Sequence, residues 1–171
     1  FENKSEIKTK DCEEMLFSKT GALFRGAAKS GAVIGSPNED YWRALADYGS
    51  KMGIGFQIWD DVLDLKGDED ETGKPVGSDI AEGKRTLIVS HFLEHCSEEQ
   101  RDEFLDILGS GSTDNVRIAI DLLESTGSID YAGERANKLI EEAKDSLDVL
   151  DDSEAKNNLR DLAEFIINRN Y

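Results

Sequence analysis

Residues 52–65 of the 171-residue chain read MGIGFQIWDDVLDL, a stretch in which apolar side chains would point in almost every direction around a helix. A helix of that composition is buried, which predicts that these residues lie at the centre of a helical bundle. The same stretch carries Asp60, Asp61 and Asp64. An ionised carboxylate in apolar surroundings is costly unless a cation or strong donors compensate it. These aspartates are therefore the first candidates for a function.

The remainder of the chain also predicts an all-α protein. Pro37 and Pro75 are its only two prolines, and apolar residues recur mostly at spacings of three and four. A polar, glycine-punctuated loop is expected at 67–78. Helices are expected at about 12–30, 39–66, 79–95, 98–108, 113–126, 128–150 and 153–168.

Charge and composition exclude several classes of partner. The chain has 20 Lys and Arg against 37 Asp and Glu, a net charge of −17, which argues against a nucleic-acid backbone or an anionic membrane surface. It contains no run of about 18 apolar residues that could span a membrane. Cys12 and Cys96 form no paired motif, so we expect a reducing, cytoplasmic location.

The three aspartates have the spacing of a metal site. Asp60 and Asp64 are one helical turn apart, Asp61 flanks them, and Gln57 extends the same face. Hard oxygen ligands suit Mg²⁺, which is usually completed by phosphate oxygens of a substrate. The bare pattern Asp-Asp-x-x-Asp is a weak signal in a chain with 19 aspartates.

Two lysines at glycine-flanked positions follow the aspartates. Lys74 comes after Gly73, and Lys84 comes after Gly83. If the carboxylates hold a metal, the metal and these lysines together could hold a diphosphate and stabilise its departure. An acidic surface loop with incidental lysines explains the residues about equally well.

Four segments together carry a resemblance to a known family. Residues 17–24 read FSKTGALF, residues 55–64 read GFQIWDDVLD, residues 73–74 are Gly-Lys, and residues 77–87 read GSDIAEGKRTL. These segments closely resemble the trans-type isoprenyl (polyprenyl) diphosphate synthases, at their second aspartate-rich motif, and suggest a geranylgeranyl or farnesyl diphosphate synthase. After about residue 110 the chain matches mainly in helical character.

The resemblance implies a fold, a reaction and a set of site residues. Family members are all-helical bundles, usually homodimers, that condense an allylic diphosphate with isopentenyl diphosphate into a longer trans-prenyl diphosphate. By motif, Mg²⁺ on the allylic diphosphate would be bound by Asp60, Asp61 and Asp64. The leaving diphosphate would be neutralised by Lys19, Lys74 and Lys84. The pocket beside the nascent carbocation would be lined by Thr20 and Gln57. Phe56, which is next to Gln57, is a further candidate for this pocket, with core packing as the alternative.

The family's first aspartate-rich motif has no counterpart before Asp60. We therefore expect residues 1–171 to be the C-terminal part of a single synthase domain, an incomplete isoprenoid-synthase-type bundle that is inactive alone. One alternative is a non-catalytic or split subunit that supplies its diphosphate site to a partner chain, and another is a related terpene-ionising enzyme. His91 and His95, within the pattern His-x-x-Glu-His, also allow a much less favoured zinc site.

Overall fold

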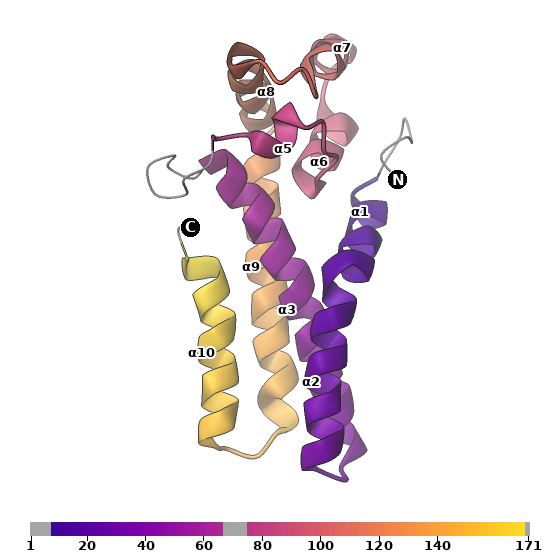
Figure 1. The fold of residues 1–171 in the computed structure, drawn as a ribbon, viewed down its shortest axis with the longest axis vertical. Coiled ribbons are helices and arrows are strands. Elements are labelled where there is room, and N and C mark those ends of the chain that lie inside the picture. Colours follow the sequence, from indigo (N-terminus) through magenta and orange to yellow (C-terminus); the bar gives the residue numbers. More distant parts are fainter. Residues whose placement is uncertain (1–7, 67–74, 170–171) are drawn as a thin grey trace. The chain divides into compact units, whose positions relative to one another are not determined.

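The computed structural model describes residues 8–66 and 75–169, and every regular element in these ranges is a helix. The prediction of an all-α protein is confirmed (Figure 1). The elements are α1 (Thr9–Leu16), a π-helical turn (Phe17–Gly21), α2 (Ala22–Gly35), α3 (Glu39–Lys66), α5 (Ser78–Ala81), α6 (Leu87–His95), α7 (Glu98–Ile107), α8 (Thr113–Ser125), α9 (Ser128–Ser146), a 3₁₀ turn (Leu147–Val149) and α10 (Glu154–Asn168).

The described residues belong to two compact units. The first unit contains residues 8–12, 60–66 and 75–133, and the second contains residues 13–59 and 134–169. The division falls within α3, between Trp59 and Asp60.

Helices α3, α9 and α10 provide the core of the second unit. Figure 1 shows α10 beside the second-unit part of α9. The buried core cluster consists of Tyr48, Met52, Ile140, Ala143, Leu147, Ala163 and Ile166. The hydroxyl of Tyr48 donates a hydrogen bond to the main-chain oxygen of Leu159 at 2.7 Å. This bond satisfies the one polar atom of a side chain that is otherwise inside the core.

Glycines bring α2 and α3 of the second unit into backbone contact. A Cβ atom on Gly49 would lie 2.5 Å from the main-chain oxygen of Phe24, and one on Gly53 would lie 2.7 Å from the Cα of Gly21. No side chain fits at those distances. Gly49 and Gly53 of α3 are therefore explained by close packing against α2 and the π-helical turn before it rather than by flexibility.

The first unit contains one clear departure from the predicted helices. The expected helix at 79–95 is wrong, because α5 ends at Ala81 and α6 begins only at Leu87. Gly83 has a φ of 74°, which ends regular helix, and the Thr86 side chain accepts a hydrogen bond from the amide of Val89 as the N-cap of α6. Across the unit, the rings of Phe92 and Phe104 pack with centroids 4.7 Å apart.

Within residues 8–66 and 75–169, no helix combines the length and the hydropathy that crossing a bilayer requires.

Candidate functional site

The last two turns of α3 carry the three predicted carboxylates, all in the first unit. Asp61 is buried, with 7% of its surface exposed, and Asp60 and Asp64 are half-buried. Val62 and Leu65, buried beside them, hold this end of the helix in the core. The helix pattern thus places carboxylates where their desolvation has to be offset by donors or a cation.

Asp64 is held by the segment that begins α5. Its Oδ1 accepts a hydrogen bond from the hydroxyl of Ser78 at 2.5 Å, and its Oδ2 accepts one from the amide of Asp79 at 3.0 Å. Its main-chain oxygen accepts a third from the amide of Gly77 at 2.8 Å. Three consecutive residues therefore fix the position of one aspartate.

Gly77 makes this arrangement possible. Its φ is 77°, a left-handed conformation that side-chain-bearing residues rarely adopt, and a Cβ atom there would lie 2.4 Å from Val116 Cγ1. The tight turn that aims Ser78 and Asp79 at Asp64 requires glycine for both reasons.

Asp79 also anchors Lys84. The Lys84 ammonium lies 2.6 Å from Asp79 Oδ1 and 2.9 Å from Glu82 Oε2. Two hydrogen bonds raise the pKa of Lys84 above its ordinary value. The bond to Asp79 has the larger effect and the bond to Glu82 the smaller one. Asp79 thus joins two predicted site residues, since its amide contacts Asp64 and its carboxylate contacts Lys84.

Sequence reasoning missed Ser78 and Asp79 as site residues. A signal was present, because Gly77 is followed at once by two side chains of the helix-capping type, just after the aspartate-rich helix. The pattern does not reveal that these side chains fold back onto Asp64, because that contact joins residues 14 and 15 positions apart.

The second unit holds Lys19, Thr20, Phe56 and Gln57. Lys19 and Thr20 lie in the π-helical turn, a feature that often marks functional positions, and Lys19 is exposed. The Thr20 hydroxyl donates a hydrogen bond to Gln57 Oε1 at 3.2 Å, which fixes the orientation of the glutamine amide. Thr20 and Gln57, two of the predicted site residues, are thus in direct contact within this unit.

Phe56 lies against Phe24 and Arg169. Its ring centroid lies 5.9 Å from that of Phe24, and the guanidinium carbon of Arg169 lies 4.1 Å from its centroid. The Arg169 main-chain oxygen also accepts a hydrogen bond from the indole of Trp59 at 3.3 Å. These contacts tie the end of the described chain to α3. Lys74, the remaining predicted lysine, lies outside the described residues.

The donor chemistry of the aspartates fits a hard cation such as Mg²⁺, since all three supply carboxylate oxygens. In the part of the chain that the structure describes, no group of three or more His, Cys, Asp and Glu side chains is already gathered as a metal centre. Asp64, for example, is engaged by Ser78 and Asp79 instead.

The two histidines of the alternative zinc pattern are engaged elsewhere. Their rings stack with centroids 4.1 Å apart. Nδ1 of His91 lies 2.9 Å from the Ser128 hydroxyl, and Nδ1 of His95 lies 2.8 Å from the main-chain oxygen of His91. Burial, together with the neighbouring His95, lowers the pKa of His91.

Comparison with known proteins gives a consistent picture. The family model described as polyprenyl synthetase matches residues 1–123. A short chain isoprenyl diphosphate synthase of Methanothermobacter thermautotrophicus is 42% identical over 171 residues, which cover 100% of this chain and 53% of that protein. A geranylgeranyl diphosphate synthase of Methanosarcina mazei is 39% identical over 173 residues, covering 100% of this chain and 52% of that protein.

Solved structures agree with the sequence relatives. The crystal structure of geranylgeranyl pyrophosphate synthetase from Pyrococcus horikoshii superimposes with a TM-score of 0.95 at 50% identity, over 99% of this chain and 52% of that one. A decaprenyl diphosphate synthase from Rhodobacter capsulatus superimposes with a TM-score of 0.89 at 30% identity, over 99% of this chain and 53% of that one. The chain spans about half the length of the curated relatives it matches.

Proposed function

The chain belongs to the polyprenyl synthetase family, and from that membership we propose that it carries the allylic-diphosphate site of a Mg²⁺-dependent prenyltransferase. The reaction proposed for the whole protein joins an allylic diphosphate to isopentenyl diphosphate and gives a longer trans-prenyl diphosphate. The observation that carries the proposal is the continuous contact from Asp64 through Asp79 to Lys84, because it links a carboxylate to a cation beside it.

The carboxylates of Asp60, Asp61 and Asp64 are proposed to bind Mg²⁺. Once bound, the ion offsets the negative charge of the diphosphate. Ser78 and the amide of Asp79 position Asp64 for that task by each donating a hydrogen bond to one of its two carboxylate oxygens. We assign Ser78 and Asp79 as positioning residues, since neither is itself proposed to touch the substrate.

The lysines are proposed to stabilise the leaving diphosphate. When the carbon–oxygen bond of the allylic diphosphate breaks, its electron pair goes to the diphosphate, so fixed cations favour the transition state over the ground state. Lys84 is suited to this role because Asp79 and Glu82 hold its ammonium in place and keep it protonated. Lys19 and Lys74 are proposed to act on the same group.

Thr20, Gln57 and Phe56 are proposed to line the side of the pocket where positive charge develops on the allylic carbon. The hydrogen bond from Thr20 fixes the Gln57 amide, so its dipole need not reorient as that charge appears. The faces of the Phe56 ring are negative and favour a cation; because Arg169 already lies over one face, the allylic cation is proposed to approach the other.

We further propose that residues 1–171 are the C-terminal part of one synthase domain, in a cytoplasmic enzyme that works as a homodimer. The exposure of Leu23 at 75% and of Ile34 at 87% on α2 supports the idea that another part of the protein covers this helix. The same exposure favours, as a second candidate, a split subunit that completes its site with a partner chain.

The site proposal is tested by calorimetric titration of dimethylallyl diphosphate in the presence of Mg²⁺. We expect Asp60→Asn with Asp64→Asn to abolish binding. Asp121→Asn with Asp145→Asn, which removes two exposed charges elsewhere, should bind like the parent. Equal binding by both double variants would refute the assignment. The chain alone is expected to incorporate no isopentenyl diphosphate.

A further inference from the structure

A pocket of about 490 Å³ lies in the second unit, and none of the residues that line it belongs to the site proposed above. Residues of α2, α3 and α9 line it, and its charged side chains are Arg25, Lys29, Arg43 and Asp47. Three bases face one acid, in a chain whose net charge is −17. The lining is thus opposite in sign to most of the molecule.

Among the described residues, no acidic side chain pairs with the two bases from α2, and the guanidinium carbon of Arg25 lies 6.0 Å from the centroid of the Phe17 ring. Arg25 and Lys29 are one helical turn apart, both are exposed, and neither forms an ion pair with another described residue. Arg43 pairs with Glu39 and Asp40 on its own helix, but its side chain is 74% exposed, and such surface pairs are weak enough to be replaced.

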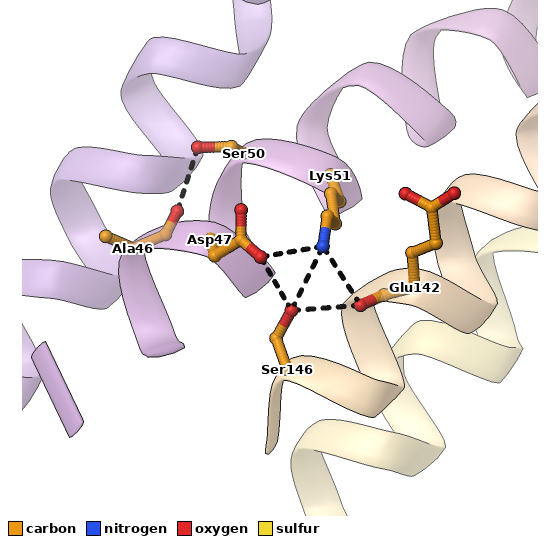
Figure 2. A network of polar contacts seen from close by, with 6 residues as sticks. All are labelled: Ala46, Asp47, Ser50, Lys51, Glu142 and Ser146. Carbon is orange, nitrogen blue, oxygen red and sulfur yellow. Dashed lines mark hydrogen bonds and ion pairs between the residues drawn. The ribbon is translucent and has the colours of Figure 1, made fainter. Parts of the chain in front are cut away.

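The acid of the lining is already neutralised. Figure 2 shows Asp47 beside Lys51 and Ser146. The Lys51 ammonium lies 2.6 Å from Asp47 Oδ2, and the Ser146 hydroxyl donates to the same oxygen at 2.9 Å. Lys51 Nζ is also 3.3 Å from the main-chain oxygen of Glu142, so the ammonium is fixed in this position. The pair Asp47–Lys51 therefore leaves the positive charge of Arg25 and Lys29 uncompensated.

We propose that this pocket binds a small polyanion of the phosphate or diphosphate class. Its volume falls within the range of small-molecule sites, roughly 300–1,000 Å³. Arginine presents a planar fork of donors that matches phosphate oxygens, and lysine adds a point charge. The Trp42 indole N–H donates a hydrogen bond to the main-chain oxygen of Ser36 at 2.7 Å. Trp42 can therefore contact a ligand through its ring but has no free donor for it.

Inorganic diphosphate without metal is the probe that isolates this pocket. Asp60, Asp61 and Asp64 repel a diphosphate when no cation is bound, so EDTA suppresses the site proposed above. The pocket needs no metal, because its own side chains supply the positive charge. The inference is therefore independent of the proposed function.

The test is calorimetric titration of the whole chain with inorganic diphosphate in EDTA at about 50 mM salt, where surface electrostatics are weakly screened. We expect Arg25→Gln with Lys29→Gln to raise the Kd at least tenfold. The matched control, Arg117→Gln with Lys138→Gln, removes two positive charges at exposed positions and should change the Kd less than twofold. Asp60→Asn with Asp64→Asn should also bind like the parent.

A gain of affinity gives a second criterion that misfolding cannot imitate. Asp47→Asn removes the one negative charge of the lining and leaves the charge of Lys51 unpaired, so we expect it to lower the Kd at least threefold. Absence of binding by the parent overturns the proposal, and so does an equal loss in the control variant. Unchanged binding by the Arg25 and Lys29 variant overturns it as well.

Dimethylallyl diphosphate in the same buffer distinguishes the source of the anion. Equal affinity for it and for inorganic diphosphate assigns the pocket to the free ion. If dimethylallyl diphosphate binds more tightly than inorganic diphosphate, and Trp42→Ala removes that difference, the pocket is assigned to an organic diphosphate whose carbon chain contacts the indole ring.

Discussion

Ser78 shows how one hydroxyl supports a charged side chain. Hydrogen bonds to charged groups contribute about 1.5–3 kcal/mol, and Ser78 supplies one to the half-buried Asp64. We expect Ser78→Ala to lower the free energy of unfolding by about 1–2 kcal/mol in EDTA, and by less with Mg²⁺, which would then compensate the carboxylate. Urea unfolding monitored by circular dichroism measures both values. Ser30→Ala, an exposed serine within α2, is the control and should not destabilise the chain.

His91 predicts a dependence of stability on pH. Its pKa is lowered in the folded chain, so the unfolded chain binds the proton more readily than the folded one. The contribution of His91 is complete above its unfolded pKa, about 6.5, and falls as the pH drops through that value toward the lower folded pKa.

Thermal unfolding between pH 7.5 and pH 5.5 measures this contribution. We expect His91→Phe, which keeps a ring against Tyr131, to lose less stability over this interval than the parent does. His95→Gln removes the neighbouring imidazole but not the burial of His91, which is the larger cause of its lowered pKa, so we expect this variant to keep part of the pH dependence that His91→Phe loses. If the melting temperatures of the parent and of His91→Phe change equally between pH 7.5 and pH 5.5, neutral His91 does not contribute to the stability of the fold.

For individual residues, the sequence predicted the chemistry that a side chain could perform better than it predicted which other side chains it contacts. Asp60, Asp64 and Lys84 could be identified as candidates because residue type and spacing along one segment are visible in the chain. Asp79 could not, because its role depends on a turn at Gly77 that returns the chain to Asp64. The hydrogen bond between Thr20 and Gln57, 37 residues apart, was not predicted either, because the resemblance implied only that both residues line one pocket.

Helices α2 and α3 depend on glycines where they meet. A Cβ atom on Gly53 would lie 2.7 Å from the Cα of Gly21, whereas one on Gly26 would meet nothing within 4 Å. We expect Gly53→Ala to destabilise the chain by about 2 kcal/mol or more, because backbone must move. Gly26→Ala should instead stabilise it by about 0.5–1 kcal/mol through helix propensity. Denaturant midpoints of the two variants should therefore shift in opposite directions.

Helix boundaries were predictable where capping and periodicity agree. The bounds 39–66 predicted for α3 are those observed, since Asn38 and Glu39 follow Pro37 and the apolar pattern is unbroken. The predicted helix at 79–95 was wrong, because apolar spacing continues across Gly83 even though the backbone there turns left-handed. Thr86 was overlooked as an N-cap for the same reason.

For the molecule as a whole, the apolar residues exposed on α2 carry a prediction about association. Leu23 and Ile34 are 75% and 87% exposed, which is unfavourable in water unless another surface covers them. We expect sedimentation velocity to show concentration-dependent self-association of the chain. Leu23→Ser with Ile34→Ser should reduce that self-association and leave Mg²⁺-dependent diphosphate binding unchanged.

Val149→Ser with Leu162→Ser is the matched control for this experiment, because both residues are 50% exposed but lie outside α2. An equal effect of the control would mean that α2 has no special role in association. The sequence could predict an incomplete bundle from the motifs that are missing. The sequence could not predict which helix would expose apolar side chains, because that depends on which face of each neighbouring helix is covered by α3.

The π-helical turn at Phe17–Gly21 has a genetic consequence. A π turn contains one residue more than the α-helical turn it replaces, so the loss of one codon here would restore regular α-helix rather than break it. Deletion of Ser18 should therefore give a chain that still folds, in contrast to single-codon deletions elsewhere in buried helices. The residues before the deletion, among them those of α1, would be rotated relative to α2, so we expect the deletion variant to fold and to bind dimethylallyl diphosphate with Mg²⁺ more weakly than the parent.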